Sequence, residues 1–136
     1  MNIDPTRPQF EAFKVLPRNR PVNMLNLVKL REKARYADGR AATGAVAYAA
    51  YGRESKPVLA KVGGEIIWRG APECMLIGPE TETWHIAFIA RYPTAGAFLA
   101  MVTDPDYQKA VIHRQAAVED SRLIRMGDLA GGGGFG

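Results

Sequence analysis

Arg114 is the side chain whose type and position suggest chemistry most directly. An apolar residue or tyrosine recurs around it at helical spacing, so Arg114 falls on the inward face of a helix predicted to end near Val118. A guanidinium keeps its charge and must find acceptors when it is turned inward. One interpretation is an internal partner such as Asp104, Glu54 or helix-end carbonyls, which is the usual situation of a buried arginine. The other is a clamp for a ligand carboxylate, two turns from Tyr107 on the same face.

The two histidines, His85 and His113, do not form a metal-binding pattern, and Cys74 has no second cysteine to pair with. We therefore expect no metal site and no resident cofactor. His85 shares a predicted strand face with Ala87, Ile89 and Arg91 in a sheet expected to line a cavity. It is either a structural or exposed histidine, or the proton-transfer group of an acid–base enzyme in which Arg114 anchors the anion.

Several other polar and aromatic side chains could contact a ligand. Asn26 interrupts an apolar strand face, where it could orient a ligand or hold a neighbouring strand. Tyr48 and Tyr51 fall on the inward stripe of a helix, with hydroxyls expected to reach the rim of the core. The candidate ligand-binding residues are Asn26, Tyr48, Tyr51, Trp68, Arg91, Tyr107 and Arg114.

The elements that must position these residues alternate in type along the chain. A capping box at Thr6 and Gln9 predicts a short helix from about Arg7 to Lys14, closed by Pro17. Pro57 is expected to kink or divide the first long helix. Predicted strands are Val22–Leu30, Glu65–Arg69, Trp84–Tyr92 and Ser121–Met126, with Glu73–Ile77 as a further strand or ribbon; the helices between them are Gly44 to about Val62, a Thr94-capped helix through Val102, and an Asp104-capped helix to about Val118.

This order predicts an α+β fold of the ferredoxin-like β-α-β-β-α-β type, an antiparallel sheet with its helices on one face. The strands Val22–Leu30 and Trp84–Tyr92 are substantially apolar on both faces. A monomer would leave the second face exposed to water, and such a patch usually marks an interface. We therefore expect a two-fold homodimer in which the sheets pack together.

Composition limits the class of protein. The length of 136 residues suits a single domain, divided here into a lead-in (1–20), a main domain (21–127) and a glycine-rich tail expected to be disordered (128–136). A single cysteine, expected to be buried, fits a reducing compartment, and the sequence shows no signal peptide or apolar span, which predicts a cytoplasmic protein without membrane partners. The net charge of +4 is spread along the chain, which argues against a nucleic-acid partner.

The sequence also resembles a known family. The carrying segments are Pro57-x-Leu59-x-x-x-Gly63-Gly64 after Tyr48, Asp104-Pro105-x-Tyr107-Gln108-x-x-x-x-x-Arg114, Val22-Asn23-Met24-Leu25-Asn26-Leu27 and Asp120-Ser121-Arg122-Leu123-Ile124. They resemble the DUF1330 family of the dimeric α/β-barrel superfamily, over roughly Pro21 to Met126. The resemblance implies a ferredoxin-like fold and a dimer with facing sheets. It does not imply an activity, because superfamily relatives include monooxygenases, decyclases, dehydratases and stress-related proteins.

Two functions remain in view. The first is a dimer that binds a small organic ligand, a carboxylate or an aromatic compound, in a pocket between sheet and helices, and that could act as a cofactor-independent acid–base enzyme. The alternative is a non-catalytic structural or regulatory dimerisation module. A cavity with converging polar side chains favours the first function, whereas a dry, fully packed interior favours the second.

Overall fold

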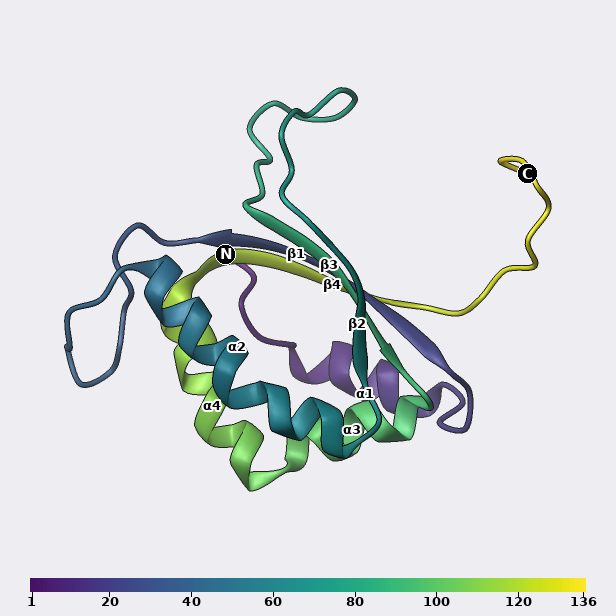
Figure 1. Ribbon diagram of the computed structural model, residues 1–136, viewed down its shortest axis with the longest axis horizontal. Coiled ribbons are helices and arrows are strands. Elements are labelled where there is room, and N and C mark those ends of the chain that lie inside the picture. Colours follow the sequence, from purple (N-terminus) through teal and green to yellow (C-terminus); the bar gives the residue numbers. More distant parts are fainter.

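Four strands form one antiparallel sheet in the order β2-β3-β1-β4, and the helices lie on one side of it (Figure 1). The computed structural model describes all residues, 1–136. The elements in chain order are α1 (Arg7–Val15), β1 (Val22–Leu30), α2 (Gly44–Lys61), β2 (Glu65–Gly70), β3 (Ile86–Tyr92), α3 (Ala95–Thr103), α4 (Pro105–Ala117) and β4 (Val118–Met126). The ferredoxin-like α+β arrangement predicted from the sequence is confirmed.

Each helix begins at a side chain that accepts a hydrogen bond from a backbone N–H of its first turn. Thr6 and Gln9 form the predicted capping box of α1, and Thr94 and Asp104 cap α3 and α4. Thr43 does the same for α2. Pro57 does not divide α2, which continues as one helix to Lys61.

The core fills the space between the helices and the facing side of the sheet, here called the inner face. Val22, Met24 and Tyr92 from the strands pack with Phe98 and other buried residues of the helices. A second cluster gathers around Val28 at the other end of β1 and includes Ala47, Tyr48, Ala117 and Val118. These two clusters hold α2 and α4 over the sheet and fix the positions of their tyrosines.

Gly44 is required where α2 begins. A Cβ at this position would lie 1.8 Å from the carbonyl oxygen of Arg31, a backbone atom that cannot move aside. The glycine thus lets the first turn of α2 pass against the chain that leaves β1.

The outer face of the sheet, away from the helices, is largely apolar and carries no layer of this chain. Direct cross-strand neighbours form a row over all four strands, from Trp68 through Ile89 and Leu25 to Ile124. Trp68 and Ile124 at the ends of this row are 53% and 48% exposed. The doubly apolar strand pattern therefore corresponds to one face packed on helices and one face open.

One predicted strand is absent, and two strands begin at other residues than predicted. Residues 73–77 form no strand, because the segment stands away from the sheet and has no neighbouring strand to pair with. Cys74, predicted to be buried, is exposed for the same reason. β3 begins at Ile86 rather than Trp84, and β4 begins at Val118 rather than Ser121. None of the helices combines the length and the apolar character needed to cross a membrane.

Candidate ligand-binding cleft

A cleft of about 1960 Å³ lies between the inner face of the sheet and the helices, and 25 of its 46 lining residues are hydrophobic. Its volume exceeds the roughly 300–1,000 Å³ of ordinary small-molecule sites, so a small ligand would occupy only part of it. Asn26 and Phe88 reach it from neighbouring strands, and Tyr48 and Tyr51 reach it from α2. The predicted pocket between sheet and helices is thus present as a space.

Three tyrosines form the polar centre of the helical wall. The hydroxyls of Tyr51 and Tyr107 lie 2.9 Å apart and hydrogen-bond to each other, which joins α2 to α4. The ring of Tyr48 packs against Tyr51 at a centroid distance of 5.5 Å. Burial raises the pKa of Tyr48 to about 12 and holds the pKa of Tyr51 well above its ordinary value. These phenols are neutral at physiological pH and can donate a hydrogen bond.

Two polar groups of the cleft have no protein partner. The hydroxyl of Tyr48 makes no hydrogen bond within the chain, although the residue is only 9% exposed. Asn26 donates from Nδ2 to the carbonyl oxygen of Met24 at 3.0 Å, while its Oδ1 makes no hydrogen bond. A polar atom in a mostly apolar cleft gains by pairing, so both atoms are available to a ligand.

Arg69 supplies a positive charge that the sequence analysis missed. The pairing of β2 with β3 shifts register between Ile66 and Trp68, so that Trp68 lies opposite Ile89 on the outer face and Arg69 lies opposite Phe88 on the inner face. Arg69 is exposed at the edge of the sheet, lines the cleft, and forms no ion pair or hydrogen bond within the chain. Its charge, like that of Arg114, counteracts part of the rise in the pKa of Tyr48.

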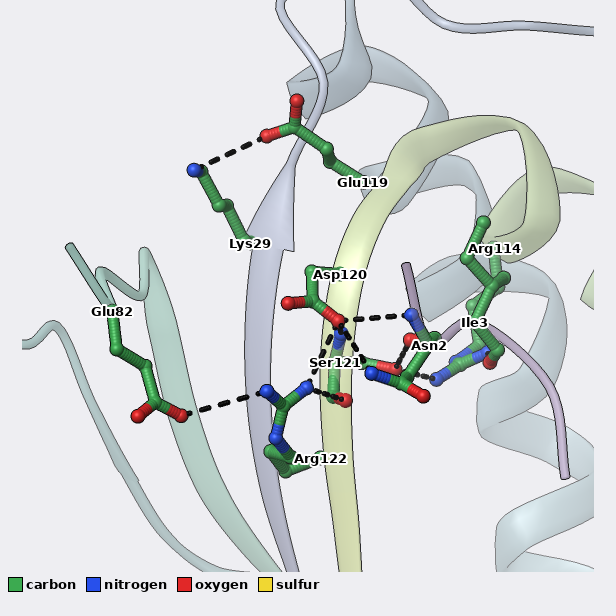
Figure 2. A network of polar contacts seen from close by, with 9 residues as sticks. All are labelled: Asn2, Ile3, Lys29, Glu82, Arg114, Glu119, Asp120, Ser121 and Arg122. Carbon is green, nitrogen blue, oxygen red and sulfur yellow. Dashed lines mark hydrogen bonds and ion pairs between the residues drawn. The ribbon is translucent and has the colours of Figure 1, made fainter.

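Arg114 faces inward as predicted, and its guanidinium is occupied by the N-terminal segment (Figure 2). Nη1 donates to the carbonyl oxygen of Ile3 at 2.5 Å, and Nη2 donates to the hydroxyl of Ser121 at 3.2 Å. Ser121 in turn donates to the carbonyl oxygen of Asn2 at 2.7 Å. Asp4 is the nearest carboxylate, at 3.9 Å. The partners of Arg114 are mainly carbonyl and hydroxyl oxygens, so neither Asp104 nor Glu54 pairs with it.

The lead-in residues therefore form part of the cleft wall. Phe13 of α1 packs against Phe98 of α3 at a centroid distance of 5.1 Å. The guanidinium of Arg125 lies 4.8 Å from the centre of the Phe13 ring and donates to the carbonyl oxygens of Phe13 and Pro17. The lead-in thus closes the side of the cleft next to β4.

His85, Trp68 and Arg91 do not line this cleft. His85 precedes β3 and is exposed, and its Nδ1 accepts a hydrogen bond from the backbone N–H of Leu30 at 2.9 Å. Arg91 lies on the outer face, where it donates to Asn23 and pairs with Asp128 at 3.3 Å. The expectation that His85 and Arg114 share one pocket is wrong, because the strand that follows His85 turns this side chain away from the helices. The predicted candidates that the cleft brings together are Asn26, Tyr48, Tyr51, Tyr107 and Arg114.

The other histidine lies in a separate chain of hydrogen bonds outside the cleft. Nδ1 of His113 is 2.6 Å from the hydroxyl of Tyr36, and Nε2 is 2.6 Å from a carboxylate oxygen of Glu54. This chain ties the loop after β1 to α2 and α4. No three His, Cys, Asp or Glu side chains gather where they could hold a metal ion.

Basic side chains outnumber acidic ones around the cleft. Arg7, Arg53, Lys56 and Arg69 form no ion pair or side-chain hydrogen bond within the chain, whereas Arg114 and Arg125 are engaged by backbone carbonyls. Such a balance favours anionic ligands over cationic ones. Apart from Arg122, whose guanidinium pairs with Glu82 on the outer face, the charged lining residues are Arg7, Arg53, Lys56, Arg69, Arg114 and Arg125 on the basic side and Asp4 and Glu65 on the acidic side.

Known proteins share this fold. The family model described as a domain of unknown function (DUF1330) matches residues 39–127. The crystal structure of methylated RPA0582, a protein of unknown function from Rhodopseudomonas palustris, is 56% identical, with a TM-score of 0.93 and coverage of 96% of this chain and 97% of that one. No curated protein matches the sequence.

Two more distant structures share only the fold. One is a dimeric ferredoxin-like protein of unknown function from Bacteroides fragilis, with 18% identity, a TM-score of 0.51 and coverage of 78% and 94%. The other is SnoaB, a cofactor-independent oxygenase from Streptomyces nogalater, with 12% identity, a TM-score of 0.54 and coverage of 82% and 96%.

Proposed function

This chain belongs to the DUF1330 family, whose function is unknown, and we propose from its own cleft that it is a homodimer whose subunits each bind a small organic anion with an apolar body. The observation that carries the proposal is that the unpaired hydroxyl of Tyr48 and the exposed, unpaired guanidinium of Arg69 line the same mostly apolar cleft.

The two groups suit a carboxylate. Arg69 supplies the charge and Tyr48, neutral because its pKa is raised to about 12, donates a hydrogen bond to the same anion. Asn26 accepts through Oδ1 from a hydroxyl or amide of the ligand, and Phe88 and the tyrosine rings cover its apolar body. Arg114 keeps the N-terminal segment in place at the far wall.

A cofactor-independent enzyme acting on the same ligand is the second candidate. The hydroxyl pair of Tyr51 and Tyr107 favours it, because two phenols 2.9 Å apart can pass a proton to or from a bound oxygen. SnoaB is an oxygenase of this fold that needs no cofactor. His85 lies outside the cleft and takes no part in this reaction. Turnover of a bound acid, lost in Tyr51→Phe while binding remains, would establish this candidate.

The homodimer is supported by the outer face. An apolar row of side chains over four strands, with Trp68 and Ile124 half exposed, needs a cover, and a second copy of the same face supplies one of matching shape. A purely structural dimerisation module would explain this face equally well. Such a module would have no use for the unpaired polar atoms of the cleft.

A thermal-shift titration tests the binding proposal. We expect 2-naphthoate and benzoate to raise the melting temperature, and the neutral 2-naphthamide and benzamide to raise it less, because binding to the folded state stabilises it. Arg69→Gln should remove the advantage of the acids. Arg35→Gln, at an exposed loop position outside the cleft, should retain it. If none of the acids changes the melting temperature of the wild type at millimolar concentration, the proposal fails.

A further inference from the structure

The segment between β2 and β3, residues 71–85, stands out from the sheet as a long arm with an apolar tip. It contains no helix or strand, and it rises on the side of the sheet opposite the helices (Figure 1). At its tip Leu76 is 88% and Ile77 is 91% exposed, and Met75 beside them is 40% exposed. Three successive apolar side chains held in water are costly unless another surface covers them.

The base of the arm is fixed to the outer face, which sets the direction in which the arm leaves the sheet. Trp84 lies under the guanidinium of Arg122, 5.0 Å from ring centre to Cζ, and Glu82 pairs with the same guanidinium at 3.6 Å (Figure 2). Arg122 stands on the outer face, directly across from Leu27 of β1. His85 anchors the end of the arm to β1 through its backbone N–H and its Nδ1.

We infer that this arm embraces a second copy of the chain, so that the tip Met75–Ile77 of each subunit packs against its partner beyond the edge of the partner's sheet. The inference rests on the proposed homodimer. Two sheets packed face to face lie about 10 Å apart. The seven residues that follow Gly70, Ala71 to Ile77, span up to roughly 23 Å when extended, at about 3.3 Å per residue. An arm of that reach passes the partner's sheet and arrives at its helical layer, beside the rim of its cleft.

The charge of the arm also favours a second copy of the chain as its partner. The arm contains Glu73, Glu80 and Glu82 and no Lys or Arg, whereas the chain as a whole carries a net charge of +4. The body of a second copy is therefore strongly basic, and basic side chains surround its cleft. An acidic arm with an apolar tip thus complements the surface that it reaches in a face-to-face dimer.

Cys74, the only cysteine and an exposed residue next to the tip, allows a direct test. A benzophenone photo-cross-linker is attached to Cys74, and labelled protein containing equal amounts of ¹⁴N and ¹⁵N subunits is irradiated. We expect covalent dimers in high yield, with peptides of the arm joined to helical-layer peptides of the other isotope. If light scattering shows a dimer but all cross-links are intramolecular, the contact between the arm and the partner is contradicted and the dimer is not. A protein that is monomeric by light scattering would overturn both.

A second variant measures the contribution of the tip. Leu76→Asp/Ile77→Asp should weaken the dimer at least tenfold in sedimentation equilibrium without unfolding the subunit, because both side chains are exposed in it. Val15→Asp, which changes an 82% exposed apolar residue on the helical side, is the matched control and should leave the dissociation constant unchanged. An unchanged dissociation constant for the tip variant would contradict the inference.

Discussion

The hydroxyls of Tyr51 and Tyr107 meet 2.9 Å apart across the boundary between α2 and α4, inside the cleft. Each residue is mostly buried, and burial raises the pKa of both phenols. The pair therefore stays neutral and acts as a hydrogen-bonded link between two helices that also carry Tyr48 and Arg114.

Removing one hydroxyl tests this link. Tyr51→Phe should reduce the free energy of unfolding by about 1 kcal/mol, since it removes a hydrogen bond and leaves the Tyr107 hydroxyl without its partner. Tyr107→Phe should have a similar effect, and the double variant should cost less than the sum of the two, as measured by urea denaturation. Additive losses would show that the two hydroxyls do not interact.

Arg114→Met should loosen the N-terminal segment. The substitution removes hydrogen bonds from a charged donor to the carbonyl of Ile3 and the hydroxyl of Ser121, which together contribute on the order of 3 kcal/mol to stability. We expect a lower urea midpoint and faster hydrogen exchange at residues 2–4. Lys109→Met on the exposed side of the same helix is the control. Full stability combined with loss of acid binding would instead assign Arg114 to the ligand.

The outer face is tested by a charge placed in its apolar row. Wild-type protein at micromolar concentration should scatter light as a particle of about twice the 14.9 kDa chain mass. Ile124→Glu should give the mass of one chain, because a dimer would bury the new carboxylate against apolar side chains. Val46→Glu, at a 60% exposed position in α2, should remain dimeric. A monomeric wild type would refute the pairing of sheets.

The ion pair and helix cap formed by Asp104 should make the stability of the protein depend on pH. Its carboxylate pairs with Lys61 at 2.7 Å and caps α4, and these contacts lower its pKa below the ordinary 3.8 and raise the pKa of Lys61 above 10.5. Because the pKa of Asp104 is lowered in the folded state, the stabilisation by its ion pair is complete above about pH 5 and is lost as the pH falls through the lowered pKa. At alkaline pH the stabilisation persists until Lys61 deprotonates. The difference in unfolding free energy between wild type and Asp104→Asn should therefore shrink from pH 7 to pH 2.5. A difference that stays constant would contradict this assignment.

Local sequence patterns predicted the elements well where the determining contacts are themselves local. The bounds of β1 and the caps Thr6, Thr94 and Asp104 depend on neighbours within a few residues, and the helical period placed Arg114 inward. The strand predicted at 73–77 failed because a strand requires a partner, which no local pattern reveals. The predicted burial of Cys74 was wrong for the same reason, because this residue belongs to the segment that does not pair.

The candidate site was predicted only in part, and the reason lies in distant contacts and one irregularity. Strict alternation from Ile66 would place Trp68 on the inner face and Arg69 on the outer face. The register shift after Ile66 reverses these positions, so the sequence pattern indicated Trp68 and missed Arg69. The partner of Arg114 is a backbone carbonyl 111 residues away at Ile3, for which side-chain types give no signal. Asn26, Tyr48 and Tyr107 line the cleft, and their inward position was predictable because polar and aromatic residues on an inward face stand out in the pattern.

Whether the cleft binds an organic anion through Arg69 can be measured by NMR with 2-naphthoate. ¹⁵N-labelled protein is titrated with the acid, and backbone amide shifts are followed in wild type and in Arg69→Gln. We expect saturable shifts confined to the cleft, at Asn26, Tyr48, Arg69 and Phe88, and their loss in Arg69→Gln. Shifts confined to the outer face around Leu25 and Ile89, or none at all at millimolar concentration, would contradict binding in the cleft.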